Sequence, residues 1–335
     1  MKFLRIKKIF FLSAFLVCGC NNDVSFQVPT SSESFNQNLA YNNKVDFLFV
    51  VDNSDSMGKV QSKLLASLVP LTATLKQLKL DYRIASTSTT MADWFPMAGR
   101  FFGEPRFITL DTPDFEARLT ERIVLGNDGA TQERGLQAIK SVLSPLYQGN
   151  EGQGFLRQDS LLVIIYISNE NDKSDNIDLS AGSKDRTKYY SDFLDQLKPT
   201  WSNGQRSWIF NFIGFISAGD PCTGGDLTGF KEVGALQMEM AQKSNGKIES
   251  ICQANLSGAI SSIKARLVEY LTDYRLSRAP ALDSIRVYVN QQLVPKDPTT
   301  GWSFIPEINV IRFNGASVPK ADDSIRVEFL PADVN

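Results

Sequence analysis

The sequence predicts an α/β protein with a doubly wound, mostly parallel sheet of six strands, helices on both faces of the sheet, and a small antiparallel β module after it. Strand and helix patterns alternate from Lys44 onward, and the segment 161–168 (LLVIIYIS) is apolar almost throughout. Such a run is typical of a parallel strand buried on both faces, and alternation of this kind indicates a parallel sheet covered by helices. Residues 277–335 instead alternate apolar and polar residues.

The expected elements follow one another along residues 44–276. Strands are expected at 45–51, 82–88, 106–110, 161–168, 207–216 and 247–251. Helices are expected at 61–78, 131–143, 184–197, 230–243 and 256–276. Ligands of open α/β sheets bind at the carboxyl ends of the strands, so the loop after the first strand is a natural place for a site.

The C-terminal segment 277–335 is predicted to be a separate, sandwich-like module. It contains SIRVYVNQQLVP, INVIRFNGASVP and SIRVEFLP, in which apolar and polar residues alternate between turn residues. This pattern is typical of antiparallel strands. The run DSIRV occurs twice, at Asp283 and Asp323, which suggests two similar strands. We expect a structural stalk or brace.

The N-terminal segment 1–19 has the features of a signal peptide. Basic residues precede an apolar stretch from Ile9 to Val17, which is too short to span a bilayer. The following VCGC resembles a bacterial lipobox, which implies lipidation of Cys20; an ordinary signal peptide is the alternative. Asn21 then favours the outer membrane of a bacterial cell envelope. Residues 20–43 are polar and are expected to form a flexible tether, with a short strand at 24–28 as the alternative.

Composition argues against several classes of function. A formal net charge of -2 gives no electrostatic basis for binding nucleic acid. The chain has no histidine, so it lacks the commonest general base and the commonest zinc ligand. Two cysteines, Cys222 and Cys252, remain after the N-terminal pair. An even pair in an exported chain suggests a disulfide, and two free thiols are the alternative.

The loop after the first strand presents Asp52, Ser54 and Ser56 as Asp-x-Ser-x-Ser. A polar helix-capping turn explains one or two of these residues. A serine elbow would need Gly-x-Ser-x-Gly and a histidine, and the sequence has neither. The third interpretation is a site for a hard metal ion, because Mg²⁺ prefers oxygen ligands.

The motif resembles the metal-ion-dependent adhesion site of von Willebrand factor type A domains. KVDFLFVVDNSDSM is similar to that family's first strand and loop, GNDGATQERGLQAI to its second metal loop, and LLVIIYISNENDKS to its fourth strand and third metal loop. The resemblance covers residues 44–275. It implies that Asp52, Ser54, Ser56 and Thr131 hold a cation whose open position accepts an acidic side chain of a protein ligand.

The third loop departs from the family pattern. Asn169 stands where an aspartate is usual, and Glu170 is a candidate substitute. A neutral Asn169 lowers the expected affinity for the cation, since hard-cation binding depends on ligand charge. It also leaves the ion more attractive to an incoming carboxylate. The expected cation is Mg²⁺, with Mn²⁺ or Ca²⁺ as alternatives.

The segment 91–107 is rich in aromatic residues. Trp94, Phe95, Phe101 and Phe102 lie among Gly and Pro residues, between the second and third expected strands. Aromatic side chains beside a cation would suit a protein partner. The alternative is that these rings pack inward as a satellite core.

Taken together, these features predict a lipid-anchored envelope protein whose type A domain binds a protein ligand through a divalent ion, in adhesion or in assembly of a surface complex. One alternative is a metal-independent scaffold that uses the same face or the 91–107 loop. A metal-assisted hydrolase is the other, but no general base is evident, so we expect a binding protein and no enzyme.

Overall fold

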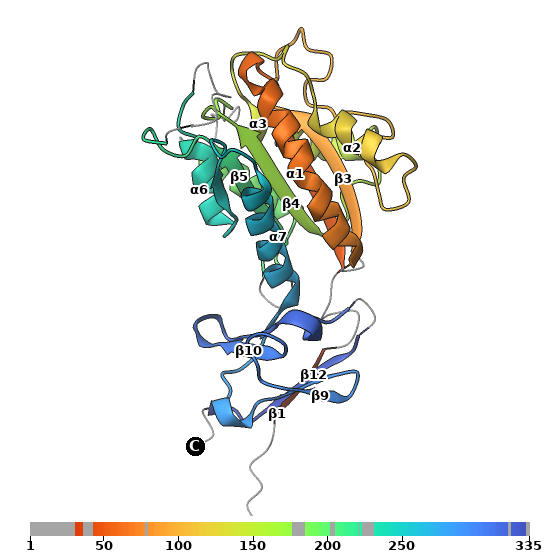
Figure 1. Ribbon diagram of the computed structural model, residues 1–335, viewed down its shortest axis with the longest axis vertical. Helices are drawn as coiled ribbons and strands as arrows, with labels where there is room; N and C mark the ends of the chain where they lie inside the picture. Colours follow the sequence, from red (N-terminus) through yellow and green to blue (C-terminus); the bar gives the residue numbers. More distant parts are fainter. Residues whose placement is uncertain are drawn as a thin grey trace, which may run out of the picture.

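The computed structural model describes residues 31–35, 43–77, 80–175, 185–201, 205–220, 222, 231–320 and 323–332. These residues form a parallel-sheet domain and, at one end of it, a small antiparallel module (Figure 1). The expected signal peptide, Cys20 and the alternative strand at 24–28 lie outside the described residues. None of the helices in the described ranges combines the length and the apolar character needed to cross a membrane.

The main sheet has five parallel strands in the order β3-β2-β4-β5-β6. They are β2 (Lys44–Val51), β3 (Asp81–Ser88), β4 (Leu161–Ser168), β5 (Trp208–Gly214) and β6 (Ile248–Ser250). From β2 the chain passes to β3 on one side and later to β4 on the other. The order therefore reverses between β2 and β4, where α/β sheets open a crevice for ligands.

The sixth expected strand, at 106–110, is not formed. Ile108 makes only an isolated antiparallel bridge to Ile84, with its N–H donating at 2.9 Å and its carbonyl accepting at 2.8 Å. A turn then closes on Thr109, whose carbonyl accepts from Thr112 N at 3.2 Å and whose N–H donates to Thr112 Oγ1 at 2.8 Å. The turn takes the backbone away from the sheet before a ladder can develop.

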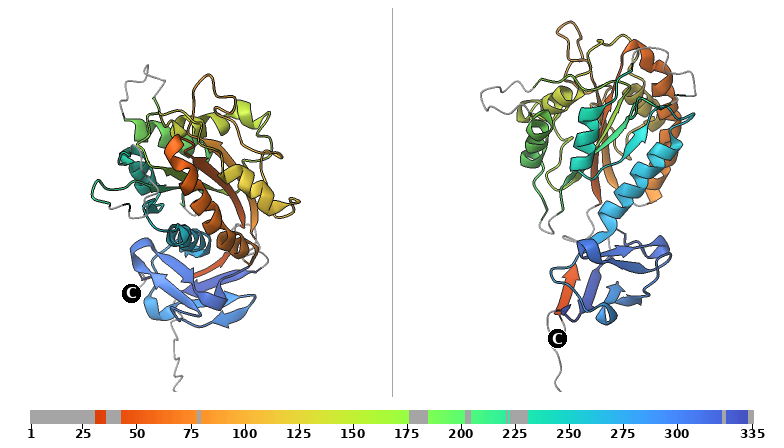
Figure 2. Two further views of the ribbon diagram at one scale, coloured as in Figure 1. Left: turned by 45° about the horizontal axis from the view of Figure 1, so that its top comes forward. Right: turned by 90° about the vertical axis from the view of Figure 1, so that its left-hand side faces the viewer.

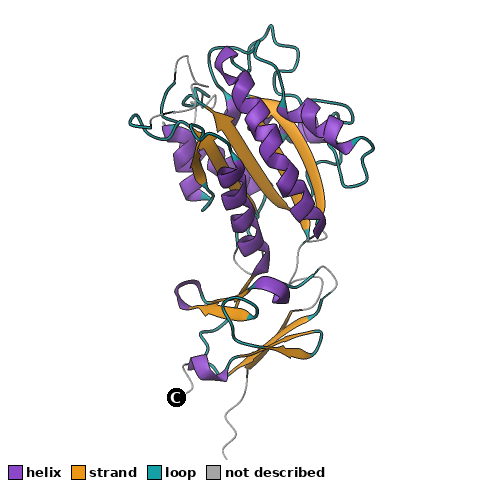
Figure 3. Ribbon diagram, in the orientation of Figure 1, coloured by secondary structure: helices purple, strands orange, loops and turns teal. Residues whose placement is uncertain are grey.

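Helices cover both faces of the sheet (Figure 3). On one face lie α1 (Gly58–Gln77), α2 (Phe115–Ile123) and α7 (Ser257–Thr272). On the other lie α3 (Gly135–Val142), α5 (Arg186–Leu197) and α6 (Ala235–Lys243), with the short α4 (Pro145–Gln148) after α3. The sequence did not lead us to expect α2 or α4. The expected helix at 256–276 ends at Thr272.

Two hydrophobic cores form because successive strand residues point to opposite faces. In β4, the odd-numbered residues from Leu161 to Ile167 pack under α1 and α7, and Leu162, Ile164 and Tyr166 pack under α3, α5 and α6. All eight residues of β4 are buried. This explains why the strand is apolar almost throughout, as the sequence analysis predicted.

The antiparallel module contains two sheets. One has the order β1-β12-β8-β9 and the other the order β10-β11-β7. Their strands are β1 (Ser31–Phe35), β7 (Asp273–Arg275), β8 (Arg286–Val289), β9 (Gln292–Val294), β10 (Trp302–Ile305), β11 (Val310–Phe313) and β12 (Ile325–Phe329). The two DSIRV copies lead into β8 and β12, which pair with each other. Strand β1 comes from the range 20–43, where a flexible tether was expected.

The module lies at the end of the sheet domain where the parallel strands begin. The carboxyl ends of these strands and the first turn of α1 lie at the opposite end of the molecule (Figures 1 and 2). The candidate site and the module are thus at opposite ends.

Candidate metal centre

Asp52 directly follows β2, where the strand order reverses between β2 and β4. Its backbone N–H donates to Ile167 O at 3.0 Å, which extends the β2–β4 ladder by one residue. Its carboxylate accepts from Ser54 N at 2.8 Å and from Ser168 Oγ at 2.7 Å, and the side chain is fully buried. These contacts fix an acidic side chain between two strand ends.

The two serines of the motif follow in a tight turn. Ser54 is extended, with φ -66° and ψ 163°, and a 3-10 helix (Asp55–Met57) begins directly after it. Among the described residues, no group donates a hydrogen bond to the buried Ser54 Oγ, and the Ser54 hydroxyl itself interacts with the carboxylate of Asp52. Ser56 is half-buried, and its Oγ accepts from Asn169 Nδ2 at 3.1 Å. The first and third loops therefore meet, as the resemblance implied.

The second loop also approaches Asp52, through a close backbone contact. Gly129 N donates to Asn53 O at 2.8 Å, and Ala130 N donates to Thr90 Oγ1 at 3.0 Å. A Cβ on Gly129 would lie 2.5 Å from Asn53 Oδ1. The approach of the two loops therefore requires glycine at this position.

Thr131, the expected ligand from the second loop, has an exposed side chain. It lines a surface depression of about 350 Å³ together with Met91, Asp93 and Arg134. In the described part of the chain, no hydrogen bond joins its hydroxyl to Asp52, Ser54 or Ser56. In this conformation Thr131 is therefore a surface residue that is not hydrogen-bonded to the motif.

Glu133, two residues after Thr131, is fully buried, and the sequence did not indicate it as a site residue. Its backbone carbonyl accepts from Lys173 N of the third loop at 2.6 Å, and one carboxylate oxygen accepts from Thr89 Oγ1. Thr89 N in turn donates to Val51 O at the end of β2, at 3.3 Å. The other oxygen, Oε1, is buried and accepts no hydrogen bond from any described residue. A glutamate inside the expected helix 131–143 gave no sequence signal of this role.

The third loop contributes Asn169 and Glu170 at the end of β4, both buried. Asp172, the next acidic residue, faces elsewhere. Its carboxylate accepts from Leu136 N at the start of α3 at 2.9 Å, from Ser174 N at 2.7 Å and from Tyr166 Oη at 2.8 Å. Asp172 is therefore satisfied by protein donors and acts as a structural cap.

The acids of the site are held where their negative charge is poorly compensated. Burial raises the pKa of Asp52. Burial, followed by the charge of Asp52, raises the pKa of Glu133 to about 9 and that of Glu170 to about 7. Lys173 opposes the rise at Glu170, but its ammonium is paired with Glu232. Buried charges of one sign are normally balanced by a partner or a metal ion.

The oxygen atoms of the site are suitable ligands for a hard divalent cation. Ser54 Oγ and Glu133 Oε1 are buried oxygens without a donor in the described structure, and Asp52 adds a carboxylate. Asp52, Glu133 and Glu170 do not all place a carboxylate oxygen within 4.8 Å of one another. Oxygens that share a Mg²⁺ ion lie at most about 4.2 Å apart. In this conformation, at most two of the three acids could therefore contact one such ion directly.

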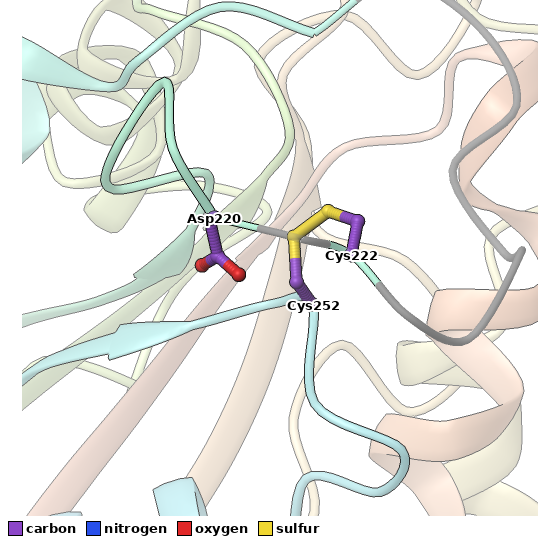
Figure 4. Close-up of side chains that lie close together, drawn as sticks. All are labelled: Asp220, Cys222 and Cys252. Carbon is purple, nitrogen blue, oxygen red and sulfur yellow. A yellow bond between two sulfur atoms is a disulfide. The ribbon is translucent and has the colours of Figure 1, made fainter.

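A second cluster lies at the edge of the sheet, beyond β5 and β6. Asp220, Cys222 and Cys252 bring one potential ligand atom each within 4.8 Å of the others (Figure 4). Cys222 and Cys252 form a disulfide, as predicted from the cysteine count. Both sulfur atoms are therefore unavailable as thiolate ligands.

The aromatic segment 91–107 divides between surface and core. Trp94 is 64% exposed and contacts Phe95 edge to face, and Phe95 lies 6.2 Å from Phe102 between ring centroids. Phe101, in contrast, is fully buried and packs against Tyr147 and Phe155. In this conformation Phe101 belongs to the core and offers no surface to a partner.

No family model and no curated protein matches this chain. Solved structures to which it is similar include proximal thread matrix protein 1 from the mussel byssus, at 9% identity and a TM-score of 0.40, over 74% of this chain and 51% of that one. A structure of the same mussel protein with a zinc-occupied MIDAS motif is 11% identical, with a TM-score of 0.40, over 72% and 51% of the two chains. The pilus adhesin RrgA from Streptococcus pneumoniae is 9% identical, with a TM-score of 0.36, over 90% and 57%.

The chain spans only about half the length of these solved structures. At such identities and TM-scores, the similarity carries no argument about function. The functional interpretation therefore rests on the geometry of the three loops.

Proposed function

We propose that this chain binds a protein ligand through a divalent cation held at the ends of β2 and β4. The observation that carries the proposal is the buried set of oxygens around Asp52, in which Ser54 Oγ has no donor among the described residues. Asp52, Ser54 and Ser56 would hold the cation; Asn169 donates a hydrogen bond to Ser56, and the charge of Asp52 acts on Glu170. A bound dication would offer a coordination position to a carboxylate of the partner. Mg²⁺ is the expected ion, with Mn²⁺ or Ca²⁺ as alternatives.

The location of the site supports a role in capture. The three loops lie at the end of the molecule farthest from the antiparallel module (Figure 2). Strand β1, the first described element, belongs to that module. An anchor preceding β1 would therefore leave the three loops directed away from the point of attachment.

We also propose that this anchor is a lipid on Cys20, in the envelope of a bacterial cell and on its outer membrane. The support is the basic, apolar and VCGC sequence of residues 1–20. Growth of cells with an alkyne-bearing palmitate should label the chain, and a Cys20→Ala chain should stay unlabelled. Equal labelling of the two chains would contradict the proposal.

The capture experiment compares envelope extracts passed over the immobilised chain in Mn²⁺ and in chelator. A partner should be retained in Mn²⁺ and released by chelator, and Asp52→Ala should abolish its retention. Asp55→Ala is the matched control, since Asp55 is an exposed aspartate of the same loop and should bind normally. Adhesion or assembly of a surface complex is the purpose that such capture would serve.

A metal-independent scaffold is the second candidate, because Trp94 is a largely exposed aromatic residue that directly follows Asp93, and Asp93 lines a surface depression together with the second loop. In that case the same partner would be retained in chelator and by Asp52→Ala, and Trp94→Ala would release it.

A further inference from the structure

We propose that Glu133, and not Thr131, is the second-loop ligand of the cation, and that its carboxylate supplies the charge that Asn169 lacks. This inference rests on the cation site proposed above. Three observations support it: the position of Glu133, the carboxylate oxygen of Glu133 that accepts no hydrogen bond from a described residue, and the number of acidic side chains near Asp52.

Hydrogen bonds tie Glu133 to the ends of two strands. Its carbonyl accepts from Lys173 N in the loop after β4, and its carboxylate accepts from Thr89 in the loop after β3. Thr89 is bonded to Val51, the residue before Asp52. Glu133 is thus held by the strands on either side of Asp52, whereas Thr131 faces the surface.

The carboxylate of Glu133 has one oxygen committed and one free. Thr89 occupies Oε2, and Oε1 is buried without a donor from the described residues. A buried anionic oxygen with no partner is costly, and coordination of a cation removes that cost. The hydrogen bond from Thr89 would at the same time orient the carboxylate, as outer-shell donors do for metal ligands.

Burial separates Glu133 from Glu170. In this conformation, at most two of the three acids could share one Mg²⁺ ion, and Asp52 is fixed in the motif itself. Glu133 is fully buried, while Glu170 retains 7% exposure. Asp52 and Glu133 together provide two negative charges, the number that a dication needs. The ion would then be fully neutralised by protein, so a partner carboxylate would be held less strongly than the sequence analysis predicts from Asp52 alone.

The test measures Mn²⁺ binding by the purified full chain. Binding is monitored by titration calorimetry and by the loss of the electron paramagnetic resonance signal of free Mn²⁺. Glu133→Gln keeps the shape of the side chain and removes its charge, and it should weaken binding at least about tenfold, the lower range reported for losing even an outer-shell partner. Thr131→Val is the matched control and should bind as the unmodified chain does. Equal binding by Glu133→Gln and the unmodified chain would overturn the inference.

Thermal unfolding separates a lost ligand from a damaged fold. In chelator, Glu133→Gln should melt close to the temperature of the unmodified chain, because the substitution keeps the shape of the side chain and an oxygen that can accept from Thr89. In Mn²⁺ the variant should melt lower than the unmodified chain, because it gains less stability from binding the ion. A variant that melts lower by the same amount in both conditions would show a structural role and overturn the inference.

A double variant that relocates one negative charge completes the design. Glu133→Gln combined with Asn169→Asp moves one negative charge from the second loop to the third, and it should regain most of the lost Mn²⁺ affinity. No recovery would overturn the claim that Glu133 replaces the missing charge. If the unmodified chain binds no Mn²⁺, the cation site itself fails. Binding that is lost in Asp52→Asn but kept in Glu133→Gln refutes only the present inference.

Discussion

Asp52 and Glu133 are acids in a place where burial favours the neutral form, and at Glu133 the charge of Asp52 adds to this effect. Proteins usually place such groups where a cation or a proton balances them. Ser54 adds a hydroxyl oxygen that no described donor uses. The local chemistry is therefore incomplete in the protein alone, and this incompleteness is the basis for proposing a cation.

Gly129 permits the close approach of the first and second loops. An alanine Cβ would lie 2.5 Å from Asn53 Oδ1 and 2.6 Å from Asn53 O, so Gly129→Ala must push the loops apart. We expect a loss of about 1–3 kcal/mol in the free energy of unfolding, the usual cost of overpacking, and weaker Mn²⁺ binding. Urea denaturation and calorimetry measure the two effects.

Gly58→Ala is the matched control for this substitution. Gly58 is helical, with φ -56° and ψ -41°, and a Cβ there meets no atom within 4 Å. We expect Gly58→Ala to be neutral or to stabilise by about 0.5–1 kcal/mol. A Gly129→Ala protein as stable as Gly58→Ala would contradict the packing argument.

Lys198, which lies at the opposite end of the sheet from Asp52, predicts how the stability of the protein depends on pH. Its ammonium is buried and donates to Arg157 O at 2.6 Å and to Ser160 O at 2.5 Å. Burial lowers the pKa of Lys198 to about 8, against an opposing effect of Asp46. Between pH 8 and about 10.5 the unfolded chain therefore holds more protons than the folded one, so stability rises with pH in this window.

The measurement is urea denaturation of the unmodified chain and of Lys198→Met at pH 7.5 and 9.5. Lys198→Met is expected to be less stable at both values, because Arg157 O and Ser160 O lose their donor. The difference in unfolding free energy should widen by about 2 kcal/mol between the two values, since only the unmodified chain gains. A constant difference would contradict the lowered pKa.

At the scale of elements, helix α3 depends on a residue from another loop for its start. Asp172 accepts from Leu136 N in the first turn of α3, and Gly135 packs so tightly on Tyr166 that a Cβ would lie 2.3 Å from its ring. The helix therefore begins at Gly135 and not at 131, where the sequence pattern placed it. This late start leaves Glu133 in the preceding loop, beside Asp52.

Asp172→Ala should destabilise the protein by about 3 kcal/mol, because the N–H groups of Leu136 and Ser174 and the hydroxyl of Tyr166 lose a buried acceptor. The loss should be the same in Mn²⁺ and in chelator, since the carboxylate is already satisfied by protein. Asp185→Ala, which removes the cap of α5 from Lys188 N, is the control at about 1 kcal/mol. A loss confined to Mn²⁺ would make Asp172 a metal ligand.

At the scale of the whole molecule, the antiparallel module is built from both ends of the described chain. Strand β1 pairs with β12 over five residues, from Ser31 opposite Phe329 to Phe35 opposite Ile325. The chain then forms the whole parallel-sheet domain before it returns through β7. Arg312 of β11 donates two hydrogen bonds of 2.7 and 2.8 Å to Asp273 of β7, and its guanidinium also lies 3.7 Å from Glu269 Oε1 of α7, which joins the module to the sheet domain. The sheet domain is thus inserted into the module.

Removal of β1 should weaken the module and leave the cation site intact. A chain that begins at residue 36 exposes the edge of β12, and the module should melt several degrees lower, since each kcal/mol lowers the melting temperature of a small domain by about 4–8 °C. A chain that begins at residue 31 keeps β1 and is the matched control. Calorimetric scans and Mn²⁺ titration distinguish the two effects, and equal scans would show that β1 contributes nothing.

The sequence by itself determined the local features of this protein. Buried strands such as β4 could be predicted from their apolar residues, and Asp52, Ser54 and Ser56 could be proposed as ligands because all three lie in one short turn after a strand. The disulfide between Cys222 and Cys252 followed from counting cysteines. Each of these depends on neighbouring residues or on composition, which the sequence displays directly.

Only the tertiary structure decided which side chains from distant segments meet. Strand β1 pairs with β12, about 300 residues later in the chain, and the segment 106–110 makes only a single bridge to the sheet. Phe101 and Glu133 are buried, and Thr131 is exposed. The physical reason is that burial and charge compensation depend on everything packed around a side chain. Nothing in the sequence marks Glu133, two residues beyond Thr131, as a residue on which the charge of Asp52 will act.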